Sequence, residues 1–177
     1  MAVFYCSACG EALTGNLNQW TEVLKTDDDH ERDPATRLAV PTVPRSFFAI
    51  DPEPWGAPYI VHDDPDWGGP FQSRCSSWAT DEGEMHSAGP RNTVVLNPYD
   101  VARLTPMETA DGCCGPMGWS GPNQACRCGA PVGTLAANCC GPHEFHLDPS
   151  RTHAQGSIVV PQCSTATGLT AADICRR

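Results

Sequence analysis

The stretch GCCGPMGWSGPNQACRCGAPVGTLAANCCGP, residues 112–142, decides how this chain folds, because it holds six of the eleven cysteines. Cys-Gly dipeptides occur in it at 114–115, 128–129 and 140–141. The cysteine of each dipeptide comes one or two residues after another cysteine. A further dipeptide, Cys9-Gly10, follows Cys6 near the N-terminus. Two thiolates on one tight turn, with a glycine that tolerates positive φ, are typical of a zinc-binding knuckle. The sequence therefore predicts zinc.

Length and composition indicate one domain with many loops. The chain has 177 residues, and its 17 prolines and 16 glycines leave few uninterrupted stretches for a long helix. Its formal net charge is −10, and four thiolates around a zinc ion add further negative charge. A phosphate backbone is repelled by such a surface, so we expect no binding to nucleic acid.

The cysteines fit metal binding better than disulfides. The N-terminus has no basic region followed by an apolar run, and no stretch approaches the ~18 apolar residues of a membrane span. We therefore expect a cytoplasmic protein that is not bound to membranes. Thiols stay reduced in the cytosol, where closely spaced cysteines more often bind metal than form disulfides.

The fold predicted from these patterns is mainly β, or α+β with few short helices, with small antiparallel strands around zinc-ribbon-like knuckles. It forms a single zinc-stabilised domain over residues 1–177. The expected parts are an N-terminal knuckle (1–24), two irregular loops (25–46 and 62–91), a cysteine-rich metal block (111–149) and a tail with a strand and a short helix (150–177).

Local patterns add individual elements. Two apolar patches, 47–50 and 59–61, predict two short strands joined by a turn, and 93–96 predicts another strand. Asn97 followed by Pro98 predicts a capped helical turn within 97–104. In the tail, 158–160 predicts a strand and 170–175 a short helix.

Two pairings of the cysteines are open. Vicinal cysteines in an extended chain point to opposite sides, so each pair offers one ligand to a given site. In the first pairing, Cys114, Cys126, Cys128 and Cys139 form one site, and Cys6 and Cys9 complete another. In the second, Cys6 and Cys9 meet Cys126 and Cys128 as in a zinc ribbon, and the vicinal pairs form a second site. The candidate ligands, for one or two zinc ions, are Cys6, Cys9, Cys113, Cys114, Cys126, Cys128 and Cys139.

Other side chains could complete a site. His143 and His146 lack the i,i+4 spacing of a metalloprotease helix, but either could act as a fourth ligand. Cys140 and Cys75 are the remaining thiol candidates.

Several motifs resemble a set of uncharacterised bacterial proteins. They are residues 4–9, 50–54, 89–98, 112–115, 121–123, Cys126, Cys128-Gly129, Cys139 and 147–149. The set has no known activity, and the resemblance implies a cytosolic location. Its third knuckle reads Cys-x-x-Cys-Gly, one residue longer than the Cys126-x-Cys128 of this chain. Cys140, His143 and His146 have no counterpart in the set, which favours Cys139 as the ligand.

Three functions are compatible with these observations. The first is a non-enzymatic, zinc-held module that binds another protein through loops rich in proline and tryptophan, since tryptophan is enriched at binding hot spots. The second is a metalloenzyme with an open zinc position. The third is a thiol-based sensor of soft metals or oxidants. The first is the prediction adopted, with no catalytic residue assigned.

Overall fold

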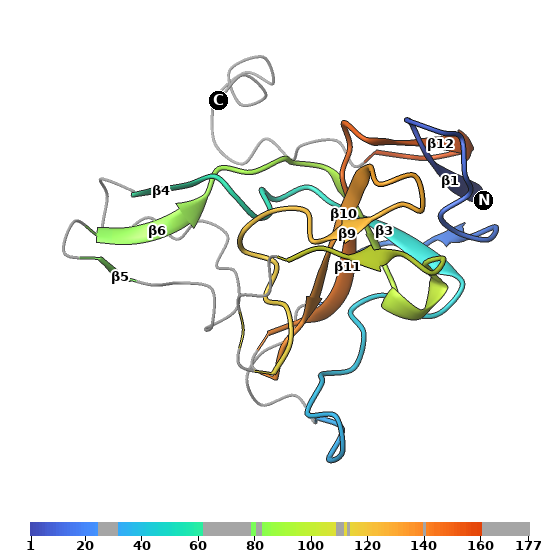
Figure 1. Ribbon diagram of the computed structural model, residues 1–177. Helices are drawn as coiled ribbons and strands as arrows, with labels where there is room; N and C mark the ends of the chain where they lie inside the picture. The colour runs from blue at the N-terminus through green and yellow to red at the C-terminus, as the bar shows by residue number, and fades with distance from the viewer. Residues whose placement is uncertain are drawn as a thin grey trace, which may run out of the picture.

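The computed structural model describes residues 1–24, 32–61, 79–80, 83–108, 112, 114–139 and 141–160 (Figure 1). These residues are almost all in β-strands and loops, which confirms the mainly β, loop-rich prediction. Helical structure among them is limited to one 3-10 turn, η1 (Pro98–Asp100). No helix in the described part of the chain is long and apolar enough to cross a membrane.

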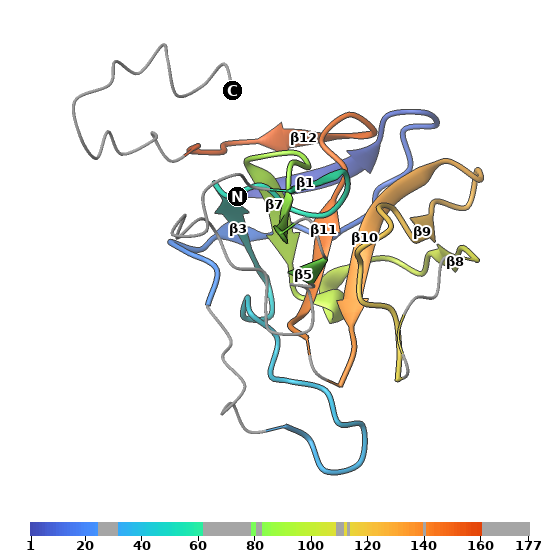
Figure 2. The same cartoon turned by 90° about the vertical axis from the view of Figure 1, so that its left-hand side faces the viewer.

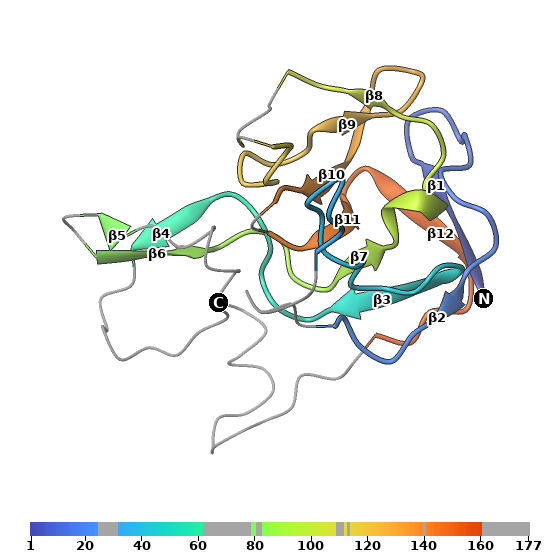
Figure 3. The same ribbon diagram turned by 90° about the horizontal axis from the view of Figure 1, so that it is seen from below.

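The main sheet has seven strands in the order β2-β3-β7-β11-β10-β9-β8. Neighbouring strands are antiparallel except β2 and β3, which are parallel. Figure 3 shows this sheet from below, with β8 and β2 at its two edges. The bounds are β2 (Asn18–Gln19), β3 (Phe47–Asp51), β7 (Thr93–Leu96), β11 (His143–Leu147), β10 (Pro131–Ala137), β9 (Gln124–Ala125) and β8 (Thr105–Pro106).

Two smaller sheets accompany the main one. The antiparallel pair of β1 (Ala2–Cys6) and β12 (Thr152–Gly156) lies across one end of it (Figure 2). The second small sheet has the order β4-β6-β5 and extends to the side of the main sheet (Figure 1). Its strands are β4 (Tyr59–Val61), β6 (Gly83–Ser87) and β5 (Ala79–Thr80).

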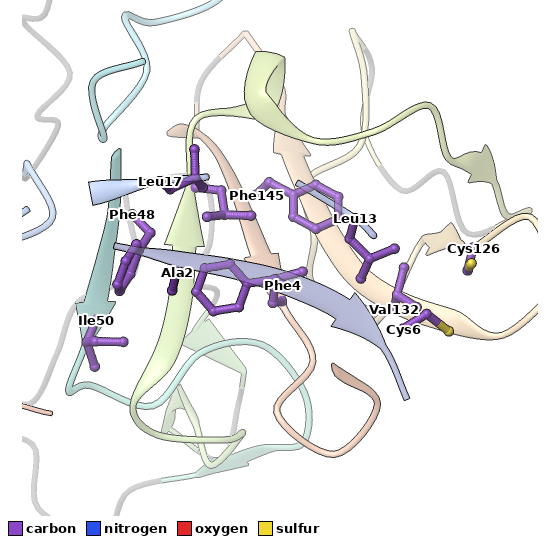
Figure 4. Close-up of a cluster of buried hydrophobic side chains, with 12 residues drawn as sticks. Ala2, Phe4, Cys6, Leu13, Leu17, Phe48, Ile50, Cys126, Val132 and Phe145 are labelled. Atoms are coloured by element: carbon purple, nitrogen blue, oxygen red, sulfur yellow. The ribbon is translucent and has the colours of Figure 1, made fainter. Parts of the chain in front are cut away.

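Alternation along the central strands gives the main sheet two different faces. On one face, Phe48 of β3, Leu96 of β7 and Phe145 of β11 are buried and lie side by side in register. Phe4 of β1 packs onto them and meets Phe48 edge to face, with ring centroids 5.2 Å apart. Figure 4 shows β1 crossing this face, with Cys6 and Cys126 at one end of the apolar cluster. Two of the cysteines, Cys6 and Cys126, are therefore part of the hydrophobic core.

The opposite face of the sheet combines a small apolar cluster with polar side chains. Ala49 of β3 and Val95 of β7 are paired in register and form the apolar part together with Val43. Glu144 and His146 of β11 lie on the same face, since His146 pairs with Val95 and strand residues two apart share a face. Both are buried, so this face is covered by other parts of the chain.

Most of the locally predicted elements form. Strands occur at both 47–51 and 59–61, although they belong to different sheets, and β7 occupies 93–96. The side chain of Asn97 caps η1 by accepting from the N–H of Tyr99. Within 62–91, where an irregular loop is expected, the described residues include β5 and β6.

The strand predicted at 158–160 is wrong, because these residues are not in a strand. The N–H of Val159 donates to the side-chain carbonyl of Gln19, and the carbonyl of Val159 accepts from the same amide group. A side chain thus takes the hydrogen bonds that a neighbouring strand would provide. The strand of this tail is β12 instead, and the helix predicted at 170–175 lies outside the described residues.

Candidate metal centre

The first half of the candidate centre is the turn that follows β1. Cys6 is the last residue of this strand, and Cys9 lies in the turn. The N–H of Gly10 donates to the carbonyl of Cys6 at 2.8 Å, and Gly10 has a φ of +74°. Glycine adopts this left-handed conformation without the steric cost that a Cβ brings. The turn therefore closes tightly and presents both thiols at the end of the strand.

The second half is built in the same way between β9 and β10. Cys126 follows β9, and Cys128 lies in the turn that leads to β10. The N–H of Gly129 donates to the carbonyl of Cys126 at 2.8 Å, and Gly129 has a φ of +87°. The N–H of Cys126 donates in turn to the carbonyl of Ala130 at 2.8 Å. The two knuckles predicted from the Cys-Gly dipeptides at positions 9 and 128 are both formed.

The tertiary fold brings the two knuckles together. The ligand atoms of Cys6, Cys9, Cys126 and Cys128 all lie within 4.8 Å of one another. Two contacts join one knuckle to the other: the Sγ atoms of Cys6 and Cys128 are 3.8 Å apart, and those of Cys9 and Cys126 are 3.7 Å apart. A disulfide bond measures about 2.05 Å, so these are four thiols.

This spacing suits a metal ion. Zinc bonds thiolate sulfur at about 2.3 Å, and a regular tetrahedron with that bond length places its sulfurs about 3.8 Å apart. Each knuckle supplies one buried sulfur, from Cys6 and Cys126, and one exposed residue, Cys9 or Cys128. The group of four cysteines can therefore hold one metal ion, with two ligands facing the core and two facing solvent.

Backbone N–H groups point at the sulfurs, as expected for a knuckle. The N–H of Ala130 bonds to Cys128 and, with the neighbouring thiol of Cys9, lowers the pKa of Cys128. Burial raises the pKa of Cys126 despite a bond from the N–H of Cys128. The N–H of Glu11 lowers the pKa of Cys9, but the thiol of Cys128, burial and the other two thiols outweigh it and raise the pKa to about 12. Without a cation the thiols must share protons, and a metal ion replaces those protons when it binds.

Two of the other predicted ligands, Cys114 and Cys139, do not join this group. Cys114 is exposed and Cys139 is half-buried, and neither belongs to the four-cysteine cluster. The structure thus forms the ribbon-like pairing of Cys6 and Cys9 with Cys126 and Cys128, and not the alternative set with Cys114 and Cys139. Cys113, Cys140 and Cys75 lie outside the described residues.

Gly115 and Pro116, the last two residues of the first Cys-Cys-Gly-Pro motif, lie against the residues that come just before the second motif. The N–H of Ala137 donates to the carbonyl of Pro116 at 2.8 Å, and the side-chain amide of Asn138 donates to the carbonyl of Gly115 at 2.9 Å. Gly115 allows this approach, because a Cβ at its position would lie 2.3 Å from the carbonyl oxygen of Ala137. The described end of the first motif is therefore hydrogen-bonded to the end of β10 and to Asn138.

The two histidines that could have completed a metal site have other partners. The Nδ1–H of His143 donates to the carbonyl of Ala39 at 3.2 Å, since a carbonyl can only accept. Burial lowers the pKa of His143, which favours the neutral ring. His146 bonds to Thr93 and Glu144, as described next. Neither histidine is part of the four-cysteine group.

A buried polar network on the other face of the sheet was missed by the sequence analysis. The hydroxyl of Thr42 donates to Oε2 of Glu144 at 2.7 Å, and Oε1 of Glu144 lies 2.9 Å from Nε2 of His146. A carboxylate oxygen accepts, so Nε2–H of His146 donates to Glu144, and Nδ1 of His146 lies 3.0 Å from the hydroxyl oxygen of Thr93, within hydrogen-bond distance. We name Thr42, Glu144, His146 and Thr93 the polar network.

In the polar network a hydroxyl, a histidine and a carboxylate are bonded in the order found in a catalytic triad, where they act as nucleophile, base and orienting group. The network is, however, closed to solvent. Thr93 is 1% exposed and His146 is 2% exposed, so no substrate reaches the hydroxyl in this structure. Each of its side-chain polar groups is bonded to another member. The arrangement is typical of a satisfied buried network rather than of an active site.

Comparisons with known proteins add no further assignment. No family model matches the chain, and neither the curated proteins nor the solved structures contain a significant match. The resemblance to uncharacterised bacterial proteins stays a prediction, as does the cytoplasmic location.

Proposed function

We propose that this chain is a zinc-stabilised β module in which Cys6, Cys9, Cys126 and Cys128 hold one zinc ion. The spacing of the four sulfurs carries the proposal, because distances of 3.7 and 3.8 Å between knuckles fit tetrahedral zinc–thiolate geometry. A set of four thiolates also favours a soft or borderline ion over magnesium or calcium, which prefer oxygen ligands.

The ion has a structural role in this proposal. Four protein sulfurs fill the tetrahedron and leave no position for a water or a substrate, as a catalytic zinc requires. The ion joins residues that are 117 and 122 positions apart, so it fastens the end of β1 to the turn between β9 and β10. A metalloenzyme would need an open coordination position, which this donor set does not provide.

The activity that we infer for the module is binding to another protein. Much of its surface consists of loops, and large apolar side chains such as Ile60 and Tyr99 are more than half exposed. The net charge of −10 opposes contact with nucleic acid and favours a partner with basic residues. A closed metal site and a sealed polar network are both consistent with a binding protein that carries out no chemistry.

The metal content of purified protein tests the zinc site. We expect one zinc per chain by elemental analysis, none in Cys126→Ser, and one in Cys114→Ser, the matched control outside the cluster. Native mass spectrometry of the same samples checks the stoichiometry and the folded state. Zinc retained by Cys126→Ser, or lost from Cys114→Ser alone, would contradict the assignment of ligands.

A further inference from the structure

Each of the two sulfur contacts between the knuckles joins an exposed cysteine to a buried one. Cys128 is exposed, and its Sγ atom lies 3.8 Å from that of Cys6, which is 0% exposed. Cys9 is exposed, and its Sγ atom lies 3.7 Å from that of Cys126, which is 2% exposed. The two contacts use each sulfur once. A reagent in the solvent therefore meets one cysteine of each contact, and the other lies behind it.

The exposed cysteines are in the reactive form when the metal is bound. Peroxides react with a thiolate rather than with a thiol, and a metal ion keeps its sulfur ligands deprotonated. Cys9 and Cys128 are then thiolates at the surface. Cys6 and Cys126 are thiolates too, but they belong to the hydrophobic core and can react only with a sulfur next to them. The site thus supplies two attacking groups and two shielded partners.

The distances favour a second step that joins the two sulfurs of each contact. A disulfide bond measures about 2.05 Å, so each pair has to approach by less than about 2 Å. When an exposed sulfur is oxidised to a sulfenic acid, a thiolate in contact with it converts it to a disulfide before further oxidation occurs. Because each sulfur has its own partner, both disulfides can form without an exchange of partners.

The two knuckles are also linked on the solvent side by a contact that does not involve the metal. Arg127 lies between Cys126 and Cys128, and its guanidinium is 3.4 Å from the carboxylate of Glu11. Glu11 belongs to the first knuckle, since its backbone carbonyl accepts from the N–H of Cys6 at 2.9 Å. The ion pair is exposed and therefore weak, but it helps to keep the knuckles adjacent while the sulfurs exchange the metal for one another.

We infer that Cys9 and Cys128 are sites of oxidation by a hydroperoxide, and that oxidation replaces the metal ion by two disulfides between the knuckles, Cys6–Cys128 and Cys9–Cys126. The inference rests on the proposed zinc site and adds a redox response to it. The module would then have two states, one held by zinc and the other by disulfides.

The chemistry balances with hydrogen peroxide as the oxidant. The exposed thiolate attacks one peroxide oxygen, the O–O bond breaks, and a sulfenic acid and a hydroxide ion form. The buried thiolate then attacks the sulfenic sulfur, forms the S–S bond and displaces the hydroxyl group as a second hydroxide. Two protons from the solvent convert the hydroxides to water. Each disulfide thus gives two electrons to one peroxide, and after two such reactions no thiolate remains to hold the ion, which is released as Zn²⁺.

The oxidised chain should stay folded, unlike the reduced chain without metal. The disulfides join residues 122 and 117 positions apart, which are the same residues that the ion joins. A disulfide stabilises by restricting the unfolded chain, and the effect increases with the length of the closed loop. Oxidation therefore changes the metal content and the surface of the knuckles while the end of β1 stays fastened to the turn between β9 and β10.

Peroxide treatment of the zinc-loaded full chain tests this. A zinc indicator follows release of the ion, peptide mapping without reduction identifies the disulfides, and circular dichroism follows the fold. We expect one zinc released per chain, the linked peptides Cys6–Cys128 and Cys9–Cys126, and an unchanged β-sheet signal. Dithiothreitol with added zinc should restore the zinc content. Because zinc is measured before peroxide is added, a chain without zinc refutes the site, and a chain that keeps its zinc refutes only the redox response.

Variants test the role of the exposed pair. The double variant Cys9→His, Cys128→His keeps ligand types that bind zinc but has no exposed thiolate in the cluster. We expect it to hold one zinc and to release it to peroxide at least tenfold more slowly than the wild type. Cys114→Ser, which removes an exposed cysteine outside the cluster, should release zinc at the wild-type rate.

Three results would overturn the inference. They are zinc still bound to the wild type after Cys114 has been oxidised, disulfides that form within a knuckle and not between knuckles, and equal rates of release in the wild type and the double variant. If the double variant does not bind zinc, the peptide map of the wild-type protein decides alone.

Discussion

The four-cysteine cluster and the polar network both gather reactive side chains, but they differ in how their polar atoms are satisfied. In the polar network each donor faces an acceptor, from Thr42 through Glu144 and His146 to Thr93. In the cluster, thiols face thiols, and their pKa values are displaced in opposite directions, upward for Cys9 and downward for Cys128.

This difference distinguishes a binding site from a structural network. A set of groups that satisfy one another has no need of a ligand and loses hydrogen bonds when one is inserted. A set of like thiols at tetrahedral spacing can exchange its protons for a metal cation, which all four sulfurs can bind at once. Chemical type alone does not separate the two, because a threonine–histidine–glutamate chain looks catalytic until its burial is considered.

Removal of metal should have the largest effect. A structural zinc contributes on the order of 10 kcal/mol at neutral pH, which is comparable to the whole stability of a typical domain. We therefore expect a chelator to unfold the chain, seen as loss of the β-sheet signal in circular dichroism and of the cooperative melting transition, and added zinc to restore both. If protein shown to be metal-free kept the same melting temperature, the four-cysteine cluster would be stable without a ligand, as the polar network is, and the ion would have no structural role.

Breaking the polar network should have the next largest effect. Glu144→Ala leaves the hydroxyl of Thr42 and Nε2–H of His146 buried without partners, which typically costs about 3–5 kcal/mol. Urea denaturation of the zinc-loaded protein measures it. The matched control is Glu53→Ala, which removes a half-exposed ion pair with Arg91 and should cost less than about 1 kcal/mol.

Zinc content sharpens this second comparison. Both variants should keep one zinc per chain, because neither side chain belongs to the cluster. A loss of less than about 1 kcal/mol in Glu144→Ala would show that solvent or a rearranged neighbour satisfies the buried groups, and the network would then not be structural.

The knuckles could be predicted because their signal is local. Cys6, Cys9 and Gly10 lie within five residues, and Cys126, Cys128 and Gly129 within four. Their pairing could not be predicted, because it depends on how β1 packs across the main sheet, a contact between residues more than 100 positions apart. The sequence left two pairings open, and only the tertiary fold separates them.

The polar network escaped the sequence analysis for a similar reason. Thr42, Thr93 and Glu144 are separated by about 50 residues each, so no spacing relates them. The one available signal was alternation in β11, where Glu144 and His146 share a face with Val95 of the neighbouring strand. Side chains on that face are expected to be exposed unless something covers the sheet, and Trp55, which does so, precedes β11 by about 90 residues.

The smallest effect on stability is expected at Asp51, which lies between the polar network and solvent. Burial raises the pKa of its carboxyl, against the N–H of Glu53 and the charge of His146, and the negative charge of Glu144 adds to the increase. An acid whose pKa is raised by folding binds its proton more tightly in the folded state, so the stability of the protein falls as the pH rises through that pKa. At pH 7 the ionised carboxylate is therefore slightly destabilising.

Asp51→Asn should accordingly stabilise the zinc-loaded protein modestly at pH 7, since asparagine keeps the oxygen that accepts from the N–H of Glu53 at 3.0 Å. The gain should shrink as the pH falls toward the ordinary aspartate value of 3.8, where the carboxyl is protonated in both states. Urea midpoints of the two proteins, compared pairwise at each pH, cancel the titration of all other groups. A gain that is constant with pH would mean that hydrogen bonding at position 51, and not the buried charge next to the network, determines the effect.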